Sequence, residues 1–73
     1  MMITHYDFIR MSEAEQYDAV WAGTFLGDRK EGDLWVQLYN VSSFYVEVYY
    51  DSGFNKIQRI RSFTKVAQLD LYL

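Results

Sequence analysis

The chain has 73 residues, no Cys, no Pro, a single His and a formal charge of −3. The lack of cysteine excludes a disulfide scaffold and a thiolate metal site, and the acidic balance argues against a basic nucleic-acid-binding domain. A composition that is 51% hydrophobic and 19% aromatic excludes a disordered tail. We therefore expect one small folded domain over residues 1–73, stabilised by an apolar core, by oligomerisation or by both.

The first residues of the chain contain no basic segment followed by an apolar run, so we expect no signal peptide. No apolar stretch approaches the roughly 20 residues that span a bilayer. These observations predict a cytoplasmic protein that is not associated with a membrane. Nothing in the sequence calls for a cofactor.

Two helical segments are predicted at the start of the chain. Residues 12–22 should form a helix, because Ser12 followed by Glu15 is the capping-box pattern that satisfies free N–H groups. Gly23 suits the end of this helix. A short helical turn is expected over residues 5–10. Large side chains at i, i+3 and i+4 spacing share one face of the longer helix: Tyr17, Val20 and Trp21.

Residues 33–51 change to the two-residue alternation of β-strands. A three-residue loop at 40–42 pairs Leu38 with Phe44 and gathers all the aliphatic side chains on one sheet face. A slip of one residue would mix the two faces, so the pattern favours this register. The alternating aliphatic and Phe positions are Leu34, Val36, Leu38, Phe44, Val46 and Val48.

The segment 51–55 is rich in turn-forming residues. A five-residue loop there pairs Tyr50 with Lys56 and places Glu47 opposite Arg59. It also leaves Ile57 pointing outward, which a β-bulge near 57–59 would resolve.

The overall prediction is an α+β domain in which an N-terminal helix packs on an antiparallel meander of three to four strands. A first strand is expected over residues 25–30, and its buried face is ambiguous because Phe25 and Leu26 are both apolar. The tail, residues 64–73, is predicted to form either a short helix or a strand.

No catalytic or metal-binding group emerges from the residues. His5 has no evident partner and is expected on the surface, and the N-cap role explains Ser12. The acidic residues 28, 31 and 33 lack the spacing of a calcium loop and suit a solvated hairpin turn. We therefore expect a protein that is not an enzyme and that has no catalytic, cofactor or metal site.

The second sheet face is predicted to carry exposed aromatic residues around Glu47. Glu47 could simply form a cross-strand ion pair worth about 0.2–1 kcal/mol. Monomers rarely leave large apolar patches bare, so either the C-terminal element or a second molecule should cover this face. The candidate interaction surface is Trp35, Tyr39, Tyr45, Glu47, Tyr49, Arg59 and Arg61.

This surface predicts an interaction module that binds a protein partner or itself, with a symmetric homodimer as the simplest assembly. The alternative is binding of a ligand or single-stranded nucleic acid on the same face through Arg59 and Arg61. The acidic total weighs against nucleic acid.

Most of the chain resembles a set of small uncharacterised bacterial proteins. The resemblance lies in apolar and aromatic positions and carries no catalytic signature. It implies a bacterial source and no known activity. The segments that carry it are 12–16, 25–29, 44–50 and 55–63.

Overall fold

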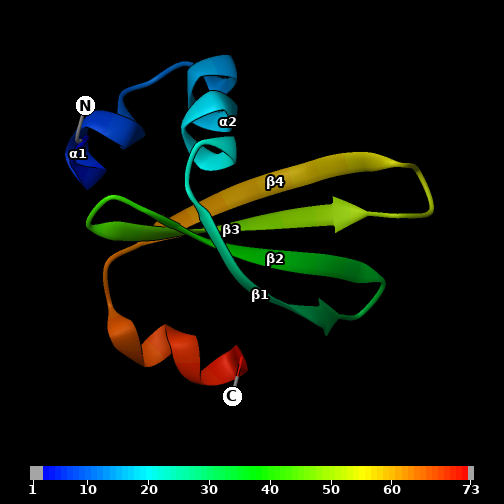
Figure 1. The fold of residues 1–73 in the computed structure, drawn as a ribbon. Helices are drawn as coiled ribbons and strands as arrows, with labels where there is room; N and C mark the ends of the chain where they lie inside the picture. Colours follow the sequence, from blue (N-terminus) through cyan, green and yellow to red (C-terminus); the bar gives the residue numbers. More distant parts are fainter. Residues whose placement is uncertain (1–2, 73) are drawn as a thin grey trace.

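The computed structural model describes residues 3–72 and confirms the predicted α+β architecture, with two short helices, a four-stranded sheet and a C-terminal 3₁₀ helix (Figure 1). The helices are α1 (His5–Ile9) and α2 (Glu13–Trp21), the strands are β1 (Thr24–Glu31), β2 (Leu34–Val41), β3 (Phe44–Asp51) and β4 (Lys56–Phe63), and the 3₁₀ helix is η1 (Val66–Tyr72).

Both helices begin with a capping box. The Ser12 hydroxyl accepts a hydrogen bond from the Glu15 N–H at 3.2 Å, and a Glu15 carboxylate oxygen accepts one from the Ser12 N–H at 3.0 Å. Thr4 and Asp7 make the same pair of bonds before α1. These bonds lower the pKa of Glu15 from its ordinary 4.5. The carboxylate therefore stabilises α2 above that value, and the contribution is lost as the pH falls through the lowered pKa.

The sheet is an antiparallel meander in the order β1-β2-β3-β4, which makes β1 and β4 the edge strands. The turn between β1 and β2 contains Gly32, whose φ of +59° suits a residue without a Cβ. The pairing of β1 with β2 shifts between Phe25 and Gly27, which marks Leu26 as the extra residue of a bulge. This bulge is the irregularity behind the ambiguous pattern of the first strand.

The predicted register between β2 and β3 is wrong, and the pairing is shifted by three residues. Val41 pairs with Phe44 across a two-residue turn, so Leu38 lies opposite Glu47 rather than opposite Phe44. Ser42 makes the tight turn possible by adopting a φ of +57°, as the first central residue of a two-residue hairpin turn must. The aliphatic residues of β2 and β3 therefore lie on opposite faces of the sheet.

We expect Ser42→Gly to stabilise the protein by about 0.5–1 kcal/mol, because glycine relieves the positive φ at this turn. Urea unfolding followed by circular dichroism measures the change. Ser43→Gly is the matched control: Ser43 does not have a positive φ, so this change should leave stability unchanged or lower it. Equal effects of the two substitutions would contradict the turn geometry.

The loop between β3 and β4 is one residue shorter than predicted, and the pairing beyond it differs as well. Asp51 pairs with Lys56, and Glu47 lies opposite Arg61 instead of Arg59. The register shifts between Tyr49 and Tyr50, so a bulge near residues 57–59 is present as expected. Its consequence is that Ile57 packs against the core instead of pointing outward.

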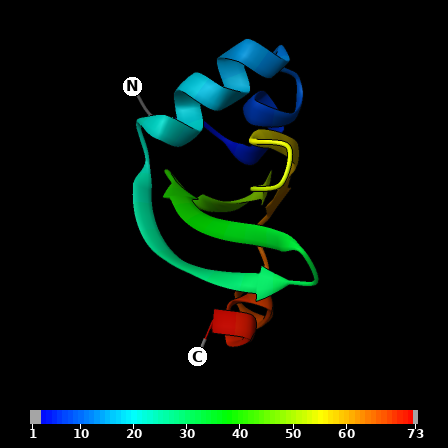
Figure 2. The ribbon, with the colours of Figure 1, turned by 90° about the vertical axis from the view of Figure 1, so that its right-hand side faces the viewer.

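The domain has three layers, with α1 and α2 on one side of the sheet and η1 on the other (Figure 2). The core on the helix side contains buried aromatic and aliphatic side chains from both helices and from β2 and β3. Gly23 lies in the short connection between α2 and β1, and a Cβ at this position would lie 2.6 Å from the Asn40 carbonyl oxygen. Glycine is needed here because the backbones of Gly23 and Asn40 approach each other closely, and not because φ is positive. The buried core residues are Phe8, Val20, Val41, Phe44, Val46 and Val48.

Candidate functional site

The predicted interaction surface is divided between the two faces of the sheet. Tyr39 lies opposite Val46 and therefore faces the helices, as does Trp35, which is four residues away on the same strand. The other five residues face η1. The physical reason is the register of the β2–β3 hairpin, which turns the aromatic residues of β2 away from those of β3. The residues that share the η1 face are Tyr45, Glu47, Tyr49, Arg59 and Arg61.

The η1 face is covered by the chain itself. Glu47 is only 1% exposed and Tyr49 is fully buried, whereas the sequence predicts both on an accessible surface. The sequence predicts that either the C-terminal element or a second molecule covers this face. In the structure the C-terminal element covers it, and this element is a 3₁₀ helix rather than a strand. Val36 and Leu38 complete the buried layer beneath it.

Glu47 is the centre of a buried hydrogen-bond cluster. Its carboxylate accepts bonds from Arg29 Nη2 at 3.1 Å, from the Tyr49 hydroxyl at 3.1 Å and from the Tyr72 hydroxyl at 2.7 Å. Arg29 also donates to Glu31 at 3.1 Å. The three donors come from β1, β3 and η1, so one carboxylate connects three elements that are distant in sequence. A buried charge is tolerated only when it is paired in this way.

The cluster changes the acidity of its members. Burial opposes the charge on Arg29, but the hydrogen bonds to Glu47 and Glu31 outweigh it and raise the pKa of the guanidinium. Burial raises the pKa of the Tyr72 hydroxyl well above 10, and its bond to Glu47 adds to the effect. Arg29 is therefore cationic and Tyr72 is a neutral donor at physiological pH. Groups whose charge states stay fixed at this pH suit binding and structural support better than proton transfer.

The two arginines of β4 are engaged by neighbouring side chains. Arg59 lies over the Tyr49 ring, 4.0 Å from its centroid, and its Nη2 is 3.8 Å from a Glu31 carboxylate oxygen. Arg61 donates to the Gln68 side chain at 3.0 Å. Both side chains remain exposed. The ion pair partly neutralises the charge that Arg59 would offer to a phosphate.

A different aromatic cluster is accessible on the helix side, at the junction of α2, β1 and β2. Trp21 and Phe25 are each about half exposed. Both meet the Tyr39 ring edge-on, with centroids 5.5 and 5.6 Å away, and Tyr17 stacks on Trp21 at 6.5 Å. We call Tyr17, Trp21, Phe25 and Tyr39 the aromatic surface. The sequence predicted the shared helical face of Tyr17 and Trp21 but not that Trp21 would meet Phe25 through Tyr39.

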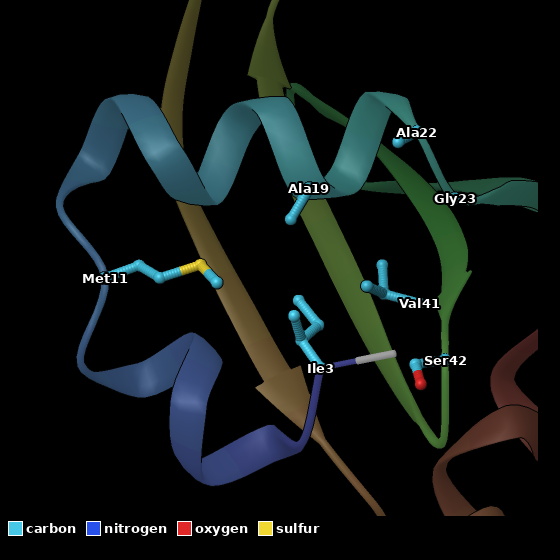
Figure 3. Close-up of a pocket in the computed structure, with 7 residues that line it drawn as sticks. All are labelled: Ile3, Met11, Ala19, Ala22, Gly23, Val41 and Ser42. Carbon is cyan, nitrogen blue, oxygen red and sulfur yellow. The ribbon is translucent and has the colours of Figure 1, made fainter. Parts of the chain in front are cut away.

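A cavity of about 370 Å³ lies between α2, the β2–β3 turn and the segment that precedes α1. Figure 3 shows Met11, Ala19 and Ile3 pointing into this space. Its lining is apolar apart from Ser42, so it offers space for an apolar group but no acid, base or metal ligand. The lining residues are Ile3, Met11, Ala19, Ala22, Gly23, Val41 and Ser42.

The lone histidine is half-buried instead of lying free on the surface. Its Nε2 is hydrogen-bonded to Ser62 Oγ at 2.8 Å, and its ring stacks on Phe44 at 5.1 Å. These contacts tie α1 to β4 and β3. Ser12 acts as the N-cap, as expected. Within residues 3–72, no three His, Asp or Glu side chains gather in a way that could hold a metal ion.

Comparisons with protein families, curated proteins and solved structures found no match. The resemblance to small bacterial proteins therefore stays a prediction. Among the described residues, no helix is long and apolar enough to cross a membrane.

Proposed function

We propose that the protein is a non-enzymatic interaction module that binds a protein through the aromatic surface, with a second copy of the chain as the partner. The observation that carries this proposal is the continuous contact of Trp21, Tyr39 and Phe25, two of which leave about half of their surface in water. Trp and Tyr are the residue types most enriched among binding hot spots. A cluster of this kind, so close to solvent, is typical of an interface.

The position of the aromatic surface supports self-association. It adjoins β1, an edge strand that pairs only with β2 in the described chain and so has one open side. A domain of this size without disulfides has a small core, and burial of additional apolar surface in a dimer would stabilise it. A symmetric dimer brings two such surfaces together at once.

Sedimentation analysis over the micromolar range tests the proposal with the double variant Trp21→Ser/Phe25→Ser. We expect the wild type to dimerise and the variant to associate at least about tenfold more weakly, because hot-spot aromatic residues carry much of the binding energy. Phe54→Ser is the control, since Phe54 is 77% exposed and lies in the β3–β4 loop. A wild type that stays monomeric at high micromolar concentration, or a variant that dimerises equally well, would refute the proposal.

The alternative function, binding of a ligand or nucleic acid through Arg59 and Arg61, has less support. Both side chains already contact residues of this chain, and Arg59 faces the carboxylate of Glu31. The aromatic rings nearest to them are buried or covered, so they offer no open platform for base stacking.

A further inference from the structure

The C-terminal 3₁₀ helix meets the sheet through the polar side chains of Gln68 and Tyr72. None of the η1 residues is buried, and Val66 and Leu71 are largely exposed. A 3₁₀ helix of seven residues is also longer than its hydrogen-bond geometry usually supports. Residues 64–65, which connect it to β4, have no regular structure. The segment therefore has the features of an element that opens without unfolding the domain.

The sheet face beneath η1 is, in contrast, well built. Val36, Leu38 and Tyr49 are buried there around the Glu47 carboxylate. The shortest hydrogen bond to this carboxylate, at 2.7 Å, comes from Tyr72 of η1. Among residues 3–72, the buried Arg29 Nε has no hydrogen-bond partner, so η1 does not satisfy every polar group of the face.

We propose that this sheet face is a peptide-binding site, which η1 occupies within the same chain, and that a tyrosine-bearing segment of another protein displaces η1 from it. The site lies on the opposite side of the sheet from the aromatic surface and does not depend on it (Figure 2). Its two states are η1 docked, as in this structure, and η1 released with the partner segment in its place.

The chemistry of the partner follows from the way in which Tyr72 is seated. Its hydroxyl donates to Glu47, and its ring lies 5.5 Å from the Arg29 guanidinium. Phenylalanine would provide the ring without the donor, and lysine would place a second cation beside Arg29. A phosphotyrosine would bring negative charge to the Glu47 carboxylate. The site therefore selects an unmodified tyrosine, with aliphatic neighbours such as those that flank Tyr72 in this chain.

A fluorescent peptide with the sequence of residues 64–73 tests the proposal in trans. We expect the full-length Tyr72→Phe variant to bind this peptide at least about tenfold more tightly than the wild type does. The variant loses a hydrogen bond to a charged group, which frees the site more often. The control variant Tyr6→Phe alters an exposed tyrosine on α1 and should bind like the wild type. Peptides with phenylalanine or phosphotyrosine at position 72 should bind at least about tenfold more weakly.

NMR spectra of the same mixtures locate the peptide. Amide shifts should appear at Glu47 and Tyr49 on β3 and not at Trp21 on α2. Equal binding to the wild type and the Tyr72→Phe variant, or shifts confined to the helix side, would overturn the proposal. Hydrogen exchange of the unmodified chain provides a second test: the amides of 66–72 should exchange at least a hundredfold faster than those of β3, and equal protection would overturn the release of η1.

Discussion

Glu47→Gln should destabilise the protein by about 3–5 kcal/mol, because it removes the buried carboxylate that is paired with Arg29 and leaves only the exposed Glu31 to balance that charge. The side chain of Glu47 is only 1% exposed, and that of Arg29 is 14% exposed, so water cannot compensate for the loss. Domains of this size seldom exceed roughly 3–5 kcal/mol of stability. We therefore expect the variant to be largely unfolded at room temperature by circular dichroism.

Two further variants separate this explanation from a general intolerance of β3. Glu31→Gln removes the other carboxylate bound to Arg29, but Glu31 is exposed, and the cost should stay below about 1 kcal/mol. Arg29→Met/Glu47→Gln removes both buried charges and should recover most of the stability that the single change loses. If Glu47→Gln costs no more than Glu31→Gln, the buried pair is not what supports the sheet.

The order and type of the elements could be predicted because their signals are local. The capping box at Ser12 and Glu15 marks the start of α2, and the two-residue alternation marks β2 and β3. The tail could not be assigned, because Val66 and Leu69 suit a helix while Leu71 and Leu73 alternate like a strand. In the structure the tail is a 3₁₀ helix, and its Tyr72 contacts Arg29 and Glu47. Both partners are far away in sequence, so no local pattern in the tail indicates these contacts.

The register of the β2–β3 hairpin could not be predicted, because alternation alone does not show whether one face of the sheet is apolar or both. The predicted register follows if only one face is apolar. Alternation then requires Leu38 to face the same way as Phe44. The protein instead buries both faces, with Phe44 under α1 and Leu38 on the η1 side. In a sheet buried on both sides, hydrophobicity does not distinguish a two-residue turn from a three-residue loop.

The register also decides which residues of the candidate site lie together. The predicted register assigns Tyr39 to the same face as Glu47 and so combines the charged cluster and the aromatic residues into one surface. In the actual register, Tyr39 joins Trp21 and Phe25 on the helix side, and Glu47 is enclosed with Tyr49 and Tyr72. One molecule thus has an accessible aromatic cluster on one face and an internally occupied polar site on the other.

Phe44→Ala should cost about 3–5 kcal/mol, because it opens a cavity at the point where both helical and sheet elements meet. Phe44 is fully buried, and its ring centroid is 5.1 Å from that of Phe8 and 5.1 Å from that of His5. Loss of the ring therefore removes the contact that fixes α1 on the sheet. Because this loss is as large as the whole stability of a domain of this size, circular dichroism without urea should already show a largely unfolded chain, and the one-dimensional NMR spectrum reports whether any of the helix side remains ordered.

Phe54→Ala is the matched control, since it makes the same chemical change at an exposed position in the β3–β4 loop. Its effect should stay within about 0.5 kcal/mol. The comparison also tests which sheet face packs against α1, because Phe44 can anchor α1 only if its ring points toward the helices. A Phe44→Ala variant as stable as Phe54→Ala would mean that Phe44 faces elsewhere, and the assignment of both sheet faces would fail with it.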